Sequence, residues 1–254
     1  MKAAVRFALL ALVASLLAAC SSAPGRPQHK GPPPAEANTQ LGVEYLRKGM
    51  NESALEKLKK AVRQDSRYAP AHDVLGLLYE QLGETAKAEK EYRRALSLEP
   101  DNPDFLNHYG QFLCTQGKLK KADDYFRKAL KDPVYGYPWL VATNAGICAH
   151  KGGDVEKAEQ YFRQALKQNP GFQPALREMI RISFARGNYL ATRAYIQRYE
   201  AQKGTMTPEL LWIAVRAEHE LGDRNAESSY ALLLKNRYPT STEAAELAKW
   251  EHER

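Results

Sequence analysis

The sequence lacks the features of several large classes of protein. Its longest apolar run, residues 7–19, is broken only by Ser15 and is too short to cross a bilayer comfortably. Its 16 Gly and 14 Pro among 254 residues are ordinary amounts, which excludes a collagen-like or low-complexity body. With 44% hydrophobic and 26% charged residues, the chain is too polar for an integral membrane protein and too apolar for a disordered one. We therefore expect one large or two ordinary folded domains.

Motifs for catalysis and metal binding are also missing. The six His are scattered without ligand spacing, and there is no Gly-rich phosphate loop, no Gly-x-Ser-x-Gly elbow and no closely spaced Cys pair. We expect neither an enzyme nor a metal or cofactor site. The net charge of +7 is spread along the chain without a basic cluster interleaved with aromatic residues, so nucleic acid is not an expected partner.

Residues 1–19 have the pattern of a secretory signal peptide, in which Lys2 and Arg6 precede the short apolar run. Residues 17–20, Leu-Ala-Ala-Cys, resemble the lipobox of bacterial lipoproteins. The resemblance implies cleavage before Cys20 and acylation of its thiol and new amino group. It also implies sorting to the outer membrane, because the residue that follows the Cys is Ser21 and not Asp. We expect a lipid-anchored protein on the periplasmic face of that membrane; the alternative is a plain signal peptide with a chance Cys.

A Pro-rich stretch follows at residues 20–34. Five of the fourteen residues from 21 to 34 are Pro, with Gly between them, so the segment cannot build a core. In polyproline geometry, at about 3.1 Å per residue, it reaches about 40 Å. We expect it to be a stiff tether between the lipidated Cys20 and the folded body.

From residue 35 the sequence repeats itself with a period of about 34 residues. Leu-Gly-x-x-Tyr at 41–45 recurs at 75–79, and Tyr-Gly-x-x-Leu follows at 109–113. Each unit then has a turn Gly, a small residue that lets two helices approach closely, and a bulky residue that fills the gap. This pattern resembles the tetratricopeptide repeat. It predicts an all-α, right-handed superhelix of six units, at about 35–68, 69–102, 103–138, 139–172, 173–206 and 207–240, closed by a capping helix at 241–254.

Two units depart from the regular period. The third and fourth are spaced by 36 residues through 132–138, a segment too rich in Pro and aromatic residues to be helical. In the sixth unit Gly222 comes one residue late, so its register is uncertain by one. We assign Ala226 to its small position and Tyr230 to its bulky position.

Two cysteines remain after Cys20. Cys114 and Cys148 fall on the first helices of the third and fourth units, about 200° apart around their respective helices, so that one can face forward and the other back along the stack. In an oxidising compartment we predict a disulfide between them. Loop closure would stabilise the irregular junction by about 3 to 4 kcal/mol. The alternative is a pair of buried thiols.

In this fold certain positions of each first helix face an inner groove. Three of them, Val43, Leu46 and Leu77, are apolar where no interior position requires it, which suits an amphipathic partner helix anchored on these side chains. Asp73 or Glu80 would supply a polar rim. The alternative is that the tether or the flanking helix covers the apolar side chains. The predicted groove residues are Val43, Leu46, Asp73, Leu77, Glu80, Asn107 and Gln111.

A lipobox, a Pro-rich tether and six tetratricopeptide units together resemble the type IV pilus biogenesis lipoproteins of the PilF/PilW pilotin family. The supporting segments are 37–42 with 45–46, 109–114 and 144–148. The resemblance implies a protein that binds the pilus secretin in the groove of its first repeat, and we expect it to be monomeric and non-enzymatic. It also implies that the protein escorts this secretin to the outer membrane and promotes its multimerisation. A periplasmic adaptor of the same fold, serving peptidoglycan enzymes or outer-membrane protein assembly, is the alternative.

Overall fold

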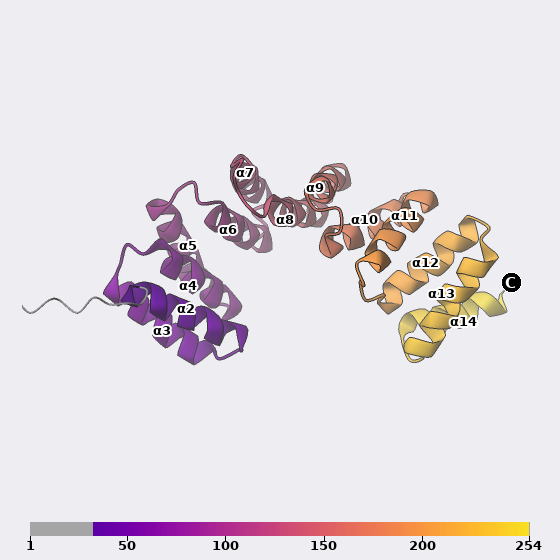
Figure 1. Cartoon of the computed structure of the whole chain (residues 1–254), viewed down its shortest axis with the longest axis horizontal. Coiled ribbons are helices and arrows are strands. Elements are labelled where there is room, and N and C mark those ends of the chain that lie inside the picture. Colours follow the sequence, from indigo (N-terminus) through magenta and orange to yellow (C-terminus); the bar gives the residue numbers. More distant parts are fainter. Residues whose placement is uncertain (1–32, 254) are drawn as a thin grey trace, which may run out of the picture.

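The computed structural model describes residues 33–253, and this part of the chain is helical apart from its connecting turns and loops. It contains thirteen helices and no strand. They form an arch that runs from α2 at one end to α14 at the other (Figure 1). Their bounds are α2 Pro34–Arg47, α3 Asn51–Gln64, α4 Ala69–Gln81, α5 Thr85–Leu98, α6 Pro103–Thr115, α7 Leu119–Ala129, α8 Pro138–Lys151, α9 Val155–Gln168, α10 Gln173–Ala185, α11 Tyr189–Ala201, α12 Pro208–Glu220, α13 Arg224–Arg237 and α14 Thr242–His252.

Six consecutive antiparallel pairs, from α2 with α3 to α12 with α13, make up the arch, and α14 packs on α12 and α13. Each even-numbered helix from α2 to α12 also contacts the next even-numbered helix, whereas the odd-numbered helices of the described part do not contact one another. The stack therefore curves with the even-numbered helices on its inner side (Figure 1). The predicted all-α superhelix of six tetratricopeptide units with a closing helix is confirmed.

Small residues place the two helices of each pair. Gly83 ends the first helix of its pair with φ of +74°, a conformation that other residues resist. Gly76 has a different role, because a Cβ there would lie 2.6 Å from the ring of Tyr92 on the paired helix. The core repeats in the same way along the arch. Its bulky positions, all fully or almost fully buried, are Leu58, Tyr92, Phe126, Phe162 and Ile196.

The sixth repeat has a different register from the one predicted. Glu227 and Ala231 are buried at the positions assigned to Ala226 and Tyr230, so that assignment was wrong by one residue. The shift arises in the connection before α12, which spans residues 202–207, whereas the one before α10 spans only 169–172. It includes Lys203 with φ of +54°. The fifth and sixth repeats are therefore offset by 35 residues, as the matching turn glycines Gly187 and Gly222 show.

The tether and the 132–138 segment each precede a helix, and both were predicted to be non-helical. Pro34, assigned to the tether, is the first residue of α2, a position where the missing N–H costs no helical hydrogen bond. The 132–138 segment is non-helical up to Pro138, as predicted. It is held by Tyr135, whose hydroxyl donates to Asp104 Oδ1 at 2.6 Å. The signal peptide, Cys20 and the tether up to residue 32 lie outside the described residues.

Candidate partner-binding groove

The three apolar residues predicted for the groove lie on two neighbouring even-numbered helices, α2 and α4, at one end of the arch. Val43, Leu46 and Leu77 are all half-buried. Leu46 packs partly on the core around Leu58, and Leu77 packs partly on the core around Tyr92. Leu46 and Leu77 are thus positioned by the core, and all three side chains still have surface left for a partner. α14, the predicted capping helix, contacts α12 and α13 at the other end of the arch.

The polar residues predicted for the groove are bonded to the next repeat. Asp73 is only 3% exposed, and its Oδ2 lies 2.7 Å from His108 Nδ1. Asn107 is also buried, and its Oδ1 accepts from Asn144 Nδ2 at 2.9 Å. The expectation that Asp73 forms an open rim is therefore corrected, because Asp73 and Asn107 belong to the floor.

Glu80 and Gln111 are the more accessible polar members, since both are half-buried. Glu80 accepts hydrogen bonds from the Tyr92 hydroxyl at 2.8 Å and from Thr115 Oγ1 at 3.2 Å. Burial and the neighbouring Glu80 carboxylate both raise the pKa of Tyr92, which keeps its hydroxyl protonated and donating. Glu80 thus links three helices and is oriented by two donors.

Sequence reasoning missed the residues that face the predicted ones across the groove, namely His108, Thr115 and Asn144. The spacing contains a signal for them. The Asp73–His108 and Glu80–Thr115 pairs are 35 residues apart, and the Asn107–Asn144 pair, across the 36-residue junction, is 37 apart. Each of these separations along the sequence is the length of the local repeat plus one residue. Positions offset by one residue in successive repeats therefore meet between neighbouring even-numbered helices.

The electrostatics of the floor centre on Asp73 and His108. Burial lowers the pKa of His108, but the hydrogen bond and charge of Asp73, with the charges of Asp104 and Glu80, outweigh it and raise the pKa above its ordinary value. The other Asp73 oxygen, Oδ1, is buried and has no partner among the described residues. The floor between α4 and α6 therefore favours positive charge and hydrogen-bond donors.

Cys114 and Cys148 lie just beyond this floor. They form a disulfide between α6 and α8, with Cα atoms 5.8 Å apart. Lys151 Nζ, on the same helix as Cys148, donates to the Cys114 carbonyl at 3.4 Å. The covalent link crosses the junction whose spacing is irregular.

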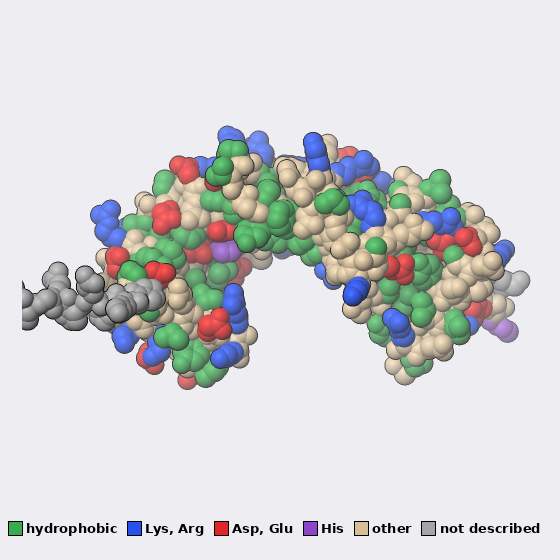
Figure 2. Space-filling model, viewed as in Figure 1, with side chains coloured by type: hydrophobic (Ala, Val, Ile, Leu, Met, Phe, Trp, Pro, Cys, Tyr) green, Lys and Arg blue, Asp and Glu red, His purple; other side chains and the backbone are tan. Residues whose placement is uncertain are grey.

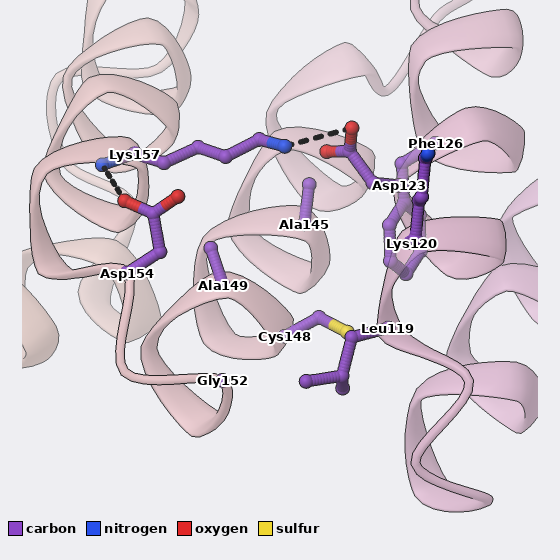
Figure 3. Close-up of a pocket in the computed structure, with 10 residues that line it drawn as sticks. All are labelled: Leu119, Lys120, Asp123, Phe126, Ala145, Cys148, Ala149, Gly152, Asp154 and Lys157. Atoms are coloured by element: carbon purple, nitrogen blue, oxygen red, sulfur yellow. Dashed lines mark hydrogen bonds and ion pairs between the residues drawn. The ribbon is translucent and has the colours of Figure 1, made fainter.

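A cavity of about 210 Å³ lies beside the disulfide, between α7, α8 and the start of α9. Figure 3 shows Cys148 and Leu119 at one side of it and Lys157 reaching across to Asp123, with Nζ and Oδ2 2.8 Å apart. Asp154 Oδ1 accepts from the backbone N–H of Lys157, as the N-cap of α9. Asp123, Asp154 and Lys157 at this cavity are thus bonded to one another. Within residues 33–253 no three His, Cys, Asp or Glu are grouped so that they could hold a metal ion, and no helix there is long and apolar enough to cross a bilayer.

Three family models match the chain, and all describe tetratricopeptide repeats. The general tetratricopeptide repeat matches at residues 39–103 and 141–172. The model for YpiA-like, C-terminal tetratricopeptide repeats matches at 74–133. The solved structures of MamA, which are 15–16% identical to this chain with TM-scores of 0.51–0.54, share the fold.

Similarity over most of the chain is found with proteins of the type IV pilus. The type IV pilus assembly protein PilF of Pseudomonas aeruginosa is 32% identical over 211 residues, which cover 83% of each chain. A solved structure of that organism's PilF covers 87% of this chain and 97% of its own, with 30% identity and a TM-score of 0.77. The structure of PilW, described as a widely conserved type IV pilus biogenesis factor, covers 84% and 98%, with 30% identity and a TM-score of 0.74. The chain therefore belongs to the family of type IV pilus biogenesis tetratricopeptide repeat proteins that includes PilF and PilW.

Proposed function

We propose that the protein is an outer-membrane lipoprotein that acts as a pilotin for a type IV pilus. In this proposal it is a non-enzymatic scaffold that binds the secretin subunit in the groove of its first repeats. It brings the subunit to the outer membrane and promotes its multimerisation. Membership of the PilF and PilW family supports the link to the pilus, and the lipobox-like residues 17–20 support the anchor.

The observation that carries the proposal is the apolar surface formed by Val43, Leu46 and Leu77 on adjacent inner helices. A partner helix laid on α2 and α4 would bury what remains exposed of these side chains, which contributes about 1 kcal/mol for each. The bonded floor beside them ties α4 to α6. This arrangement matches the helix-in-groove mode of peptide recognition, in which a few apolar anchors supply most of the affinity.

The position of the groove in the chain also supports a role close to a membrane. α2 begins at Pro34, so the first repeat follows the tether directly. With Cys20 acylated, the groove would lie within the reach of the tether, about 40 Å from the bilayer. Tethering raises the local concentration of a bound partner. A single acyl chain binds a membrane only marginally, so full acylation of the Cys matters for stable anchoring.

The test replaces an anchor with a charge in the host cell. Val43→Asp and Leu46→Asp are expected to abolish secretin multimers in outer-membrane fractions, because a partner helix would bury an unpaired carboxylate. The matched control is Leu190→Asp, at a leucine that is 68% exposed on the outer helix α11. Circular dichroism and thermal unfolding establish that each variant folds. Normal multimers in both groove variants would show that this groove is not where the secretin subunit binds.

Two further measurements separate the parts of the proposal. Cys20→Ser is expected to leave the protein in the soluble periplasmic fraction, and an unchanged outer-membrane fraction would contradict the anchor. Deletion of the gene is expected to abolish twitching motility and secretin multimers. Intact pili with altered cell shape or porin content would instead favour the adaptor for peptidoglycan enzymes or outer-membrane protein assembly.

A further inference from the structure

The inner face of the other end of the arch has a different chemistry. On α10 and α12 the buried side chains are apolar apart from Ser183 and Glu218. Five large side chains of these two inner helices stay half-buried or exposed and form a set. We call this set the C-terminal inner face: Arg177, Arg181, Phe184, Trp212 and Arg216. Contacts between the two helices tie it together, because Arg181 on α10 pairs with Glu209 on α12 and Arg216 on α12 lies over Phe184 on α10.

The charges of this face do not cancel. Arg181 takes up both nearby acidic residues, with its Nε and Nη2 donating to Glu209 at 2.7 and 2.6 Å and its Nη1 to Glu178 at 2.5 Å. The hydrogen bond and charge of Arg181, and to a smaller extent the charge of Arg177, lower the pKa of the Glu209 carboxyl. Arg177 and Arg216 form no ion pair and donate no hydrogen bond within residues 33–253. Neither guanidinium group is therefore ion-paired, and the three arginines exceed Glu178 and Glu209 by one positive charge.

Each of these two arginines is positioned by its surroundings. Arg177 is half-buried, and its Nε is buried without a hydrogen-bond partner in the described part of the chain. A buried N–H without a partner is costly, so an acceptor that reached it would be favoured. The Arg216 guanidinium lies 4.6 Å from the ring centroid of Phe184 and 5.7 Å from that of Trp212. Stacking on rings holds a guanidinium while its N–H edge stays free to bind a carboxylate in bidentate fashion.

The shape of the molecule decides between kinds of anionic partner. The face lies on the inner helices, and the molecule is deeply hollowed between the two ends of the arch (Figure 2). A flat bilayer of anionic lipid cannot enter that hollow, whereas a segment of polypeptide can. The inner helices α4 and α6 carry the accessible carboxylates Glu80 and Asp104, so an acidic segment is favoured at the C-terminal end instead.

We propose that the C-terminal inner face binds an acidic segment of a partner polypeptide, with carboxylates at Arg177 and Arg216 and an apolar side chain against Trp212. This site lies on different repeats from the groove on α2 and α4. It goes beyond the proposed pilotin function, since it does not depend on which protein occupies that groove.

The test uses the full-length protein in a neutral detergent and a defined probe. The probe is an acetylated and amidated peptide of four Glu-Glu-Leu triplets, compared with its Gln-Gln-Leu analogue, and binding is measured by calorimetry and by tryptophan fluorescence. The Glu peptide is expected to bind and to change the fluorescence of Trp212, and the Gln analogue is not. Arg177→Gln combined with Arg216→Gln should weaken binding about tenfold, since two charge-assisted contacts are lost.

A matched control separates a site from general attraction to a basic protein. Lys90→Gln with Lys167→Gln removes the same charge from exposed residues of the outer helices α5 and α9 and should leave the affinity unchanged. Trp212→Phe should abolish the fluorescence change while most of the affinity remains. The Val43→Asp variant should bind the Glu peptide with the affinity of the wild type. Failure of the proposed secretin groove can therefore be told apart from failure of the proposed C-terminal site. Circular dichroism establishes that each variant is folded.

Three outcomes would overturn the proposal. One is a Glu peptide that does not bind with saturation. Another is equal weakening by the arginine and lysine double variants, which would indicate unspecific electrostatics. The third is an arginine-dependent binding of vesicles containing phosphatidylglycerol without binding of the peptide, which would make the face a membrane contact.

Discussion

The disulfide between Cys114 and Cys148 permits a quantitative test of how the repeats hold together. The perturbation is the double substitution Cys114→Ala with Cys148→Ala. In the structure the bond joins α6 to α8, and the whole of α7 lies inside the loop that it closes. Both cysteines are buried, so the bond is shielded from solvent in the folded protein.

The magnitude follows from the length of that loop. For a sequence separation of 34 residues, the chain-entropy model gives a loss of about 13 cal/mol/K in the unfolded state, or about 4 kcal/mol at 25 °C. In a stack of repeats each unit contacts only its neighbours, so this stabilisation acts mainly on the third and fourth units. If the stack unfolds as one unit, the melting temperature should fall by about 10 °C.

Urea unfolding under oxidising and reducing conditions measures the effect. Oxidised wild type should exceed the double variant by about 4 kcal/mol, and reduced wild type should lie close to the variant. The variant is also measured in reductant. Comparing it there with reduced wild type isolates the effect of the two lost sulfur atoms, because neither protein then has the disulfide. Hydrogen exchange should show the loss of protection first in α6 to α8.

Two results would refute the reasoning. A difference of less than about 1 kcal/mol between oxidised wild type and the variant would show that the loop is not constrained as the entropy model requires. A thiol count on denatured, non-reduced protein that found both Cys114 and Cys148 free would show that the bond is absent in cells.

Two further predictions concern the core and the groove floor. Gly76→Ala should destabilise the fold by about 1–3 kcal/mol in urea unfolding, because its Cβ would lie 2.6 Å from the buried Tyr92 ring; unchanged stability would mean that the ring moves freely. The raised pKa of His108 means that its pairing with Asp73 stabilises the fold fully below the unfolded pKa near 6.5, and that this contribution is lost as the pH rises through the folded pKa. The stability gap between wild type and His108→Gln, measured in urea at pH 5.5 and pH 9, should therefore be wider at pH 5.5, and a gap that widened with pH would contradict the pairing.

Much of the architecture could be predicted because it depends on local steric rules that recur. A Gly at the turn of each pair, a small residue at the contact and a bulky residue opposite act within one pair of helices. Gly83 and the Gly76–Tyr92 contact illustrate this, since each involves residues less than one repeat apart. A period of 34 residues then shows them several times over, and repetition makes a weak local signal strong.

The contacts between repeats were less predictable. The positions that face the inner side could be named, but not which of them would be open. Asp73 and Asn107 are buried because successive repeats are rotated so that each meets a residue one period and one position further along. That rotation comes from the packing of whole helices, and no residue type in the sequence encodes it.

The sequence by itself determined the helical pairs, their number and the pairing of small with bulky residues, because these depend on sterics within a single repeat. Only the tertiary structure decided the register of the sixth repeat, where the longer connection around Lys203 shifts Glu227 into the small position. It also decided that Arg177 and Arg216 form no ion pair among the described residues of the inner face. The physical reasons differ: the register follows from the length of one connection, whereas which side chains meet across successive repeats depends on how whole helices pack along the arch.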